Sequence, residues 1–229
     1  MGDSVTAMNG TTNATVNIPV GVRPRGIAAN PVTNRVYVAN IWSNTVSVID
    51  GITNAVIATI PVGELPYSVA VNAATNKVYV ANQGETVFEP GIVTIIDGVT
   101  HETATITAGI QPAFVAVNTT TNKVYVLGGQ ANGDITVVDG ATGATTHVSI
   151  PYGPWGIAAL SSIAINETTN RVYVTDNDST NLLVIDGATN QVTLRPVGTY
   201  PVFVSVNPAN NRVYVSNSND AAVTVIDEN

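Results

Sequence analysis

The sequence has no cysteine, few charged residues and no long apolar run. Without cysteine the chain can form no disulfide, no thiolate metal site and no thiol nucleophile. No apolar run reaches the roughly 18 residues that a membrane-spanning helix needs, which argues against membrane insertion. Residues 1–9 contain neither a basic nor an apolar segment, so we expect no secretory signal there and interpret the chain as a mature fragment with a new start.

Basic residues are scarce, and most of them share one position of a repeat. The net charge is −8 and the pI is near 4.4, so the field of the whole protein repels phosphate backbones and disfavours nucleic acid and anionic membranes as partners. We interpret the five recurring basic residues as solvated or salt-bridging rim residues. They are Arg35, Lys77, Lys123, Arg171 and Arg212.

One motif is repeated through the chain. The sequence Thr-Asn-Arg-Val-Tyr-Val at residues 33–38 recurs, nearly unchanged, at 75–80, 121–126, 169–174 and 210–215. Successive motif tyrosines are 42, 46, 48 and 41 residues apart, a period that fits four short strands per unit.

Three further segments keep step with this motif. In the first unit they are residues 27–30 before it, and 46–51 and 55–60 after it; all have strand composition. Asn, Asp, Gly and Pro separate the segments, and we assign these asparagines and aspartates to turns. We therefore predict that each unit forms a four-stranded antiparallel meander. The motif tyrosine is expected on the second strand, packed between neighbouring sheets.

The predicted fold is an all-β, five-bladed β-propeller in a single domain, residues 1–229. The blades are expected at residues 22–62, 63–108, 109–152, 153–197 and 198–229. The fifth unit ends after its third strand, and residues 11–20 resemble the fourth strand of the first unit. We therefore predict that this N-terminal strand completes the last blade and closes the ring, which removes the open sheet edges. The isolated domain is expected to be a monomer.

The repeats also resemble a known family. Val-Tyr-Val-Ala-Asn at residues 36–40 and 78–82 and Val-Tyr-Val-Ser-Asn at 213–217 are each followed by a Val-Ile-Asp or Ile-Ile-Asp strand. These motifs are similar to the YVTN family of β-propeller repeats, found in archaeal surface-layer proteins and in bacterial secreted or periplasmic proteins. The resemblance covers residues 12–227 and implies the fold more than the function. Family members usually form seven blades. Together with the Thr-, Asn-, Val- and Gly-rich composition, the resemblance implies a location outside the cytoplasm.

Catalytic and metal-binding patterns are weak. The first strand of each unit contains no Asp or Glu, and the nearest acid, Glu64, has no evident partner, so the carboxylate pair of a glycosidase is not visible. Asp176 and Asp178 lie in a polar loop that could hold Ca²⁺, but the spaced glycine and distal glutamate of an EF-hand are missing, which favours a plain polar loop. We predict no catalytic residue and no cofactor.

The loops between units, and those after the second strands, vary most and carry aromatic and Arg residues. They include a long insertion at residues 83–90. Both kinds of loop emerge on one face of a propeller, where such residues suit recognition. An alternative is that Trp155 and Phe114 fill the central channel or pack under the loops, because large aromatics are more often buried than exposed. The candidate binding residues are Arg23, Arg25, Trp42, Tyr67, Phe88, Gln111, Tyr152, Trp155 and Tyr200.

These observations favour a non-enzymatic binding or scaffolding module. We expect it at the cell surface or elsewhere outside the cytoplasm, recognising a protein or glycan through this loop face. One alternative is an enzyme, a glycosidase or lyase acting in the central pocket. Another is a surface-layer building block that packs against copies of itself.

Overall fold

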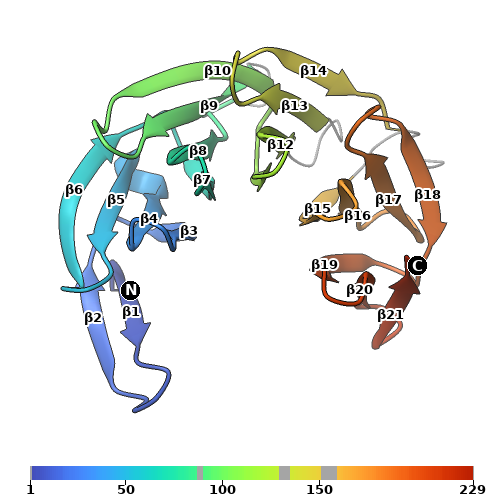
Figure 1. Ribbon diagram of the computed structural model, residues 1–229, viewed down its shortest axis with the longest axis horizontal. Coiled ribbons are helices and arrows are strands. Elements are labelled where there is room, and N and C mark those ends of the chain that lie inside the picture. The colour runs from blue at the N-terminus through green and yellow to red at the C-terminus, as the bar shows by residue number, and fades with distance from the viewer. Residues whose placement is uncertain (1, 87–89, 129–134, 151–158, 229) are drawn as a thin grey trace. The chain divides into compact units, whose positions relative to one another are not determined.

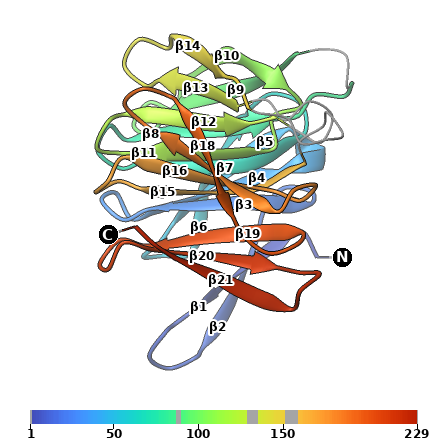
Figure 2. The ribbon, with the colours of Figure 1, turned by 90° about the vertical axis from the view of Figure 1, so that its right-hand side faces the viewer.

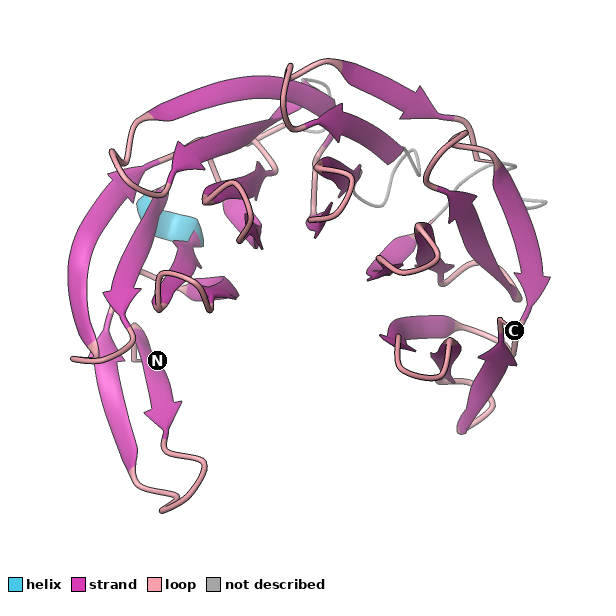
Figure 3. Ribbon diagram, viewed as in Figure 1, coloured by secondary structure: helices cyan, strands magenta, loops and turns pink. Residues whose placement is uncertain are grey.

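A computed structural model describes residues 2–86, 90–128, 135–150 and 159–228. The predicted residues Phe88, Tyr152 and Trp155 lie outside these ranges. The described chain is all-β, as predicted, apart from the short 3₁₀ helix η1 (Ile41–Ser43) (Figure 3). It divides into two compact units, Met1–Thr107 and Ala108–Asn229, which are described in turn.

The first unit contains a hairpin and two four-stranded sheets (Figure 1). The hairpin joins β1 (Ser4–Met8) to β2 (Thr15–Pro19). The first sheet runs β3 (Pro24–Asn30), β4 (Arg35–Asn40), β5 (Thr45–Asp50), β6 (Ala55–Pro61). The second sheet runs β7 (Pro66–Asn72), β8 (Lys77–Asn82), β9 (Pro90–Asp97), β10 (Thr103–Ile110).

The second unit contains two four-stranded sheets and one of three strands. The first comprises β11 (Phe114–Asn118), β12 (Lys123–Leu127), β13 (Ile135–Asp139) and β14 (Thr145–Val148). The next comprises β15 (Leu160–Asn166), β16 (Arg171–Asp176), β17 (Asn181–Asp186) and β18 (Val192–Pro196). The last comprises β19 (Pro201–Asn207), β20 (Arg212–Asn217) and β21 (Ala222–Asp227), which lie side by side in Figure 2.

The predicted four-strand meander is confirmed in four sheets, and the motif tyrosine has the same register throughout. On β4, Tyr37 pairs with Ala28 of β3 and Val48 of β5. Four of the five motif tyrosines are fully buried, and Tyr37 packs in one cluster with Val69 and Val80 of the following sheet. Tyr125 and Tyr173 pack against the following sheet in the same way, so these three tyrosines lie between neighbouring sheets, as the repeat predicts.

The N-terminal hairpin was not predicted. The segment 11–20 was expected to complete the last sheet, but β2 pairs with β1 from Ser4↔Pro19 to Met8↔Thr15, and the β19–β21 sheet has three strands. Six sheets are therefore present in the described residues where five were predicted. β1 corresponds to the third strand of a repeat unit, which explains why β2 pairs with it. Asn9 Oδ1 caps the turn after β1 in the same way as Asp50 caps the turn after β5.

The turn assignments are confirmed by hydrogen bonds. After the third strand of each four-stranded sheet, one aspartate carboxylate accepts the N–H groups two and three residues further along, at 2.8–3.0 Å. These bonds stabilise the ionised carboxylate and lower its pKa. The four residues are Asp50, Asp97, Asp139 and Asp186.

Stability should fall in acid because of these caps. The pKa of Asp139 is held below its ordinary value of 3.8 by the N–H groups of Thr142 and Ala141, so its stabilising effect is present above that value and is lost as the pH falls through the folded-state pKa. We expect the urea midpoint to be flat from about pH 7 to 5 and to decline below about pH 4. Asp139→Asn places at this turn the residue that caps the turn after β1, Asn9, and removes the titrating group. The urea midpoint of this variant should therefore decline less steeply below about pH 4. An unchanged profile in that variant would contradict the assignment.

The recurring basic residues form ion pairs, as predicted, at Arg171 and Arg212, and two others bond the backbone of the next sheet. The Arg35 guanidinium donates to the carbonyl of Gly98, and the Lys123 ammonium donates to the carbonyl of Gly187. Each acceptor lies in the turn after the third strand of the next sheet. At the same repeat position, Arg171 forms an ion pair with Glu228, whose side chain is only 2% exposed. Arg35, Lys123 and Arg171 therefore tie consecutive sheets together, whereas Arg212 pairs with Asp227 of its own sheet.

Asparagine pairs form a second link between consecutive sheets. The last residue of the first strand donates its side-chain N–H to an asparagine in the first turn of the next sheet: Asn118 to Asn170 at 3.0 Å, and Asn166 to Asn211 at 3.3 Å. The receiving asparagines have left-handed backbone, with φ of 52° and 51°. The Asn-rich turns thus cap their own chain and also connect the sheets.

Candidate functional site

One backbone arrangement recurs in the loops that enter the first strand of a sheet. In each Gly-x-x-Pro segment the residue before proline has a left-handed backbone, which costs roughly 1–3 kcal/mol for a residue other than glycine. These residues are Arg23, Leu65, Gln111 and Tyr200, with φ of 56°, 51°, 47° and 55°. The Arg23 carbonyl accepts the N–H of Ile41 at 3.1 Å, and that of Leu65 accepts the N–H of Gln83 at 3.1 Å. The backbone is fixed while the displayed side chain changes from sheet to sheet.

The glycine of this segment packs on the asparagine of the Val-Tyr-Val-x-Asn motif. A Cβ at Gly63 would lie 2.9 Å from Cγ of Asn82, a contact too close for any side chain. The Asn82 Nδ2 donates to the Thr94 hydroxyl at 2.9 Å, and Asn40 donates to Ser47 in the same way at 3.0 Å. The signature asparagine therefore joins the second strand, the third strand and the entering loop, and its role is structural.

Arg23 and Trp42 form the most exposed pair. The Arg23 guanidinium carbon lies 4.6 Å from the centre of the Trp42 ring, and Trp42 is 64% exposed. Asp3 accepts the Arg23 backbone N–H at 3.0 Å, which helps to hold the loop. A cavity of about 730 Å³ lies beside the pair; it is lined by Gly2, Asp3, Ser4, Val22, Arg23, Pro24 and Trp42. A flat aromatic face, a guanidinium and a carboxylate thus border one hollow.

Arg25 and Tyr67 form a second pair, between the first two sheets. The Arg25 guanidinium carbon lies 3.6 Å from the centre of the Tyr67 ring, and the guanidinium donates to the Tyr67 hydroxyl. The two strands approach closely because Gly26 has no side chain: a Cβ there would lie 2.9 Å from the Ser68 Cα. Four of the nine predicted residues are therefore brought together as two cation–aromatic pairs.

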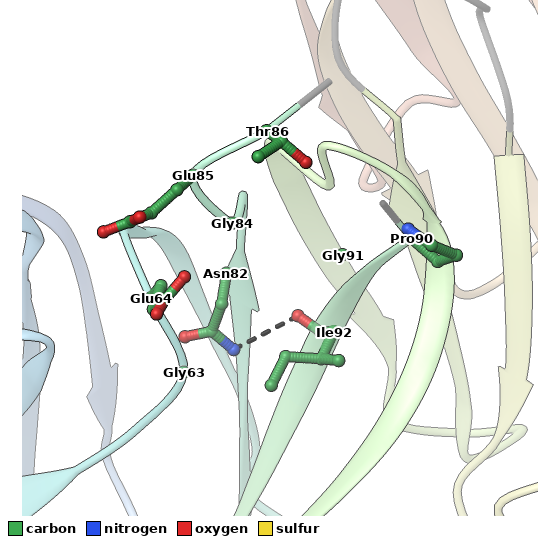
Figure 4. Close-up of a pocket in the computed structure, with 9 residues that line it drawn as sticks. All are labelled: Gly63, Glu64, Asn82, Gly84, Glu85, Thr86, Pro90, Gly91 and Ile92. Carbon is green, nitrogen blue, oxygen red and sulfur yellow. Dashed lines mark hydrogen bonds between the residues drawn. The ribbon is translucent and has the colours of Figure 1, made fainter. Parts of the chain in front are cut away.

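A second cavity, of about 360 Å³, lies between the β6–β7 and β8–β9 loops (Figure 4). It is lined by Gly63, Glu64, Asn82, Gly84, Glu85, Thr86, Pro90, Gly91 and Ile92. The sequence analysis found no partner for Glu64, yet Glu85 lines the same cavity. The signal for Glu85 was the insertion at residues 83–90, but nothing in the sequence aligned it with Glu64.

The remaining predicted residues lie elsewhere. Gln111 and Tyr200 are in the second unit, each before a proline. Asp176 is buried and accepts the N–H groups of Ala159 at 2.9 Å and Asp178 at 3.1 Å, and burial raises its pKa. It therefore clamps its own loop. Within the described ranges no group of three His, Cys, Asp or Glu residues could hold a metal ion, and no helix is long and apolar enough to cross a membrane.

Comparison with known proteins identifies the fold class. No family model matches the chain. A Myceliophteria thermophila Cps50 (Swd1) β-propeller domain matches 97% of this chain and 68% of that one, with a TM-score of 0.70 and 10% identity. A Kuenenia stuttgartiensis hydrazine synthase matches 98% of this chain and 89% of that one, with a TM-score of 0.61 and 17% identity. The chain is thus similar to β-propellers and has that fold.

The sequence comparison is much shorter. A segment of 34 residues, 15% of this chain, is 62% identical to the PE-PGRS family protein PE_PGRS18 of Mycobacterium tuberculosis (strain ATCC 25618 / H37Rv). The match spans 7% of the length of that relative.

Proposed function

We propose that this β-propeller is a non-enzymatic binding or scaffolding module that recognises a protein or glycan through its loop face. Propeller domains commonly mediate protein interactions, which fits a module of this kind. Fold alone does not determine function, so the proposal depends on the surface that the loops display.

The observation that carries the proposal is the exposed Trp42 ring with Arg23 stacked on it beside a cavity. Trp and Arg are enriched among residues that dominate binding energy, and loops on a rigid scaffold commonly carry recognition. The Arg23 carbonyl accepts the N–H of Ile41, and the Asp3 carboxylate accepts the N–H of Arg23; both bonds fix this loop before a partner arrives. Such preorganisation lowers the entropy lost on binding.

The same proposal places the chain outside the cytoplasm, as a relative of the YVTN repeat proteins. Its support is the repeated Val-Tyr-Val-x-Asn motif, the absence of cysteine and the low charge content of 10%. Expression of the full-length gene product in its source organism, followed by cell fractionation, tests the location.

Trp42 offers a direct test of the binding surface. The chain has two tryptophans, so Trp155→Phe leaves Trp42 as the sole indole fluorophore. We expect glycan or protein ligands found on printed arrays to change its emission, and Trp42→Ala and Arg23→Ala to weaken array binding by about thirtyfold or more, the effect of losing a hot spot of about 2 kcal/mol.

Val32→Ala is the matched control, because Val32 is 75% exposed in the β3–β4 turn at the other end of the same sheet. This variant should bind like the parent protein. Equal binding by Trp42→Ala and the parent would place the recognition surface elsewhere.

A glycosidase is the second candidate, and one observation favours it: Glu64 and Glu85 line a single cavity. Glycoside hydrolysis uses two carboxylates that flank the scissile bond. Under our proposal a panel of aryl glycosides should be hydrolysed no faster by the parent protein than by Glu64→Gln. Hydrolysis that Glu64→Gln and Glu85→Gln both abolish would establish the enzyme instead.

A further inference from the structure

Arg23 carries a charge that the described scaffold does not use. Other basic residues bond within the chain to a hydroxyl, a backbone carbonyl or a carboxylate; they are Arg25, Arg35, Lys123, Arg171 and Arg212. The exposed Arg23 guanidinium instead contacts the Trp42 ring, and it has no hydrogen-bonded acceptor among the described residues. Its N–H donors are therefore available to a ligand.

The repeat scaffold does not require this pair of side chains. Trp42 donates its backbone N–H to the entering loop at 3.3 Å, and Gly84 makes the same bond in the second sheet at 3.2 Å. Leu65 and Tyr200 stand where Arg23 does, with the same left-handed backbone. The loops thus fold with other side chains at both positions, so the fold itself does not account for the arginine and the tryptophan.

The hollow beside the pair combines apolar and polar surface. Its volume of about 730 Å³ is within the range of about 300–1,000 Å³ for organic ligands. Val22 and Pro24 line it together with the Trp42 ring. Asp3 is exposed, and its Oδ1 accepts the Arg23 backbone N–H at 3.0 Å, so the second carboxylate oxygen remains an acceptor for a ligand.

These groups select a class of ligand. A guanidinium favours a carboxylate, which it holds through two parallel N–H···O bonds. Asp3 and the net charge of −8 act against a ligand with many negative charges, such as a nucleic acid or a phosphorylated peptide. The ligand that suits the whole hollow has one carboxylate for Arg23, hydroxyl donors for Asp3 and a face for Trp42.

A uronic acid meets these three requirements. It carries one carboxylate and several hydroxyls, and the C–H groups of its pyranose ring suit the electron-rich face of an indole. A glutamate side chain of a protein supplies the carboxylate, but neither the hydroxyl donors nor the ring face.

We propose that the hollow beside Trp42 binds a uronic acid residue of an acidic glycan. The Arg23 guanidinium donates to the sugar carboxylate, the Asp3 carboxylate accepts a ring hydroxyl, and the Trp42 ring packs against the pyranose. The proposal deepens the proposed function, because it rests on recognition by the loop face, and it selects a glycan over a protein as the ligand.

Two matched sugars test this site. Methyl β-D-glucuronide and methyl β-D-glucoside differ by a carboxylate in place of a hydroxymethyl group. Titrated into ¹⁵N-labelled Trp155→Phe protein, the glucuronide should shift the indole N–H of Trp42 and the amide resonances of Asp3 and Ser4. Its dissociation constant should be at least about tenfold lower than that of the glucoside, the effect of one charge-assisted hydrogen bond. Salt at about 1 M should reduce this ratio, because it screens exposed charges.

Arg23→Gln should bring the ratio of the two dissociation constants close to one. The ratio is the informative measurement, since a general loss of structure would weaken both sugars alike. Arg195→Gln is the matched control: it removes the same charge from an exposed arginine on β18 and should leave the ratio unchanged.

The remaining outcomes would overturn the proposal. Equal binding of the two sugars by the parent protein would do so, as would the absence of shifts with the glucuronide. Shifts with Nα-acetylglutamate amide but with neither sugar would replace the glycan by an acidic side chain of a protein partner. Equal binding of the sugars that still requires Trp42 would refute only the acidic ligand, whereas array binding that does not require Trp42 would refute the proposed recognition surface.

Discussion

Tyr125→Ala is expected to destabilise the protein by about 3–5 kcal/mol, the cost of deleting a buried aromatic side chain. Tyr125 is 0% exposed and packs with Leu127 of its own strand and with Val172 and Val174 of the next sheet. The substitution therefore opens a cavity between two sheets, where the surrounding strands are fixed by their ladders and can collapse only partly.

Tyr125→Phe should behave in the opposite way. The Tyr125 hydroxyl is buried without a hydrogen-bond partner, and burial raises its pKa to about 12. Removing an unsatisfied hydroxyl while keeping the ring should be neutral or stabilising.

Urea unfolding at pH 7 followed by circular dichroism checks both variants. Tyr214→Ala, at the equivalent position of the three-stranded sheet, is the control and should cost less because Tyr214 is only partly buried. A loss of stability in Tyr125→Phe similar to that in Tyr125→Ala would show that the hydroxyl has a partner after all.

Asn118→Ala has the second largest expected effect, about 2–4 kcal/mol of lost stability, because it leaves several buried polar groups unpaired. Asn118 is fully buried; its Oδ1 accepts the N–H groups of Thr120 and Thr121 at 3.1 Å, and its Nδ2 donates to Asn170 at 3.0 Å. The variant therefore loses a turn cap and a link between sheets together.

Asn207→Ala separates these two contributions. Asn207 has the same repeat position and caps its own turn through the Ala209 N–H at 3.1 Å, but it is exposed in the last sheet. We expect a loss of about 1 kcal/mol there, typical of a cap. Thermal unfolding of both variants gives the comparison, and equal losses would mean that the link from Asn118 to Asn170 contributes nothing.

Much of the fold could be predicted because the repeat signals are local. The tyrosine spacing gave four strands per unit, and the Asn and Asp positions gave the turns, since an Asx side chain bonds its own backbone two residues on. β1 was missed because Ser4-Val-Thr-Ala-Met has weaker strand composition than its repeats and lacks the Asp-Gly that follows them. The sequence analysis therefore assigned β2 to the last sheet and overlooked its pairing with β1.

The candidate site was only partly predictable for a related reason. Exposed aromatics in variable loops pointed to Arg23 and Trp42, which are near one another in both sequence and space. Glu64 and Glu85 come from loops that follow different strands, and only the pairing of β7 with β8 brings them to one cavity. The bonds of Arg35 and Lys123 could not be predicted, because their acceptors lie in the next sheet, about 60 residues along the chain.

The sequence by itself determined the strands, the turns between them and the burial of the motif tyrosines, because each depends on side chains acting on their own backbone or on a regular period. The tertiary structure alone decided which loops share a cavity, which sheet accepts each basic side chain and which strand pairs with β2. Those outcomes depend on contacts between segments far apart in the chain, whose geometry is set by sheet packing and carries no local signature.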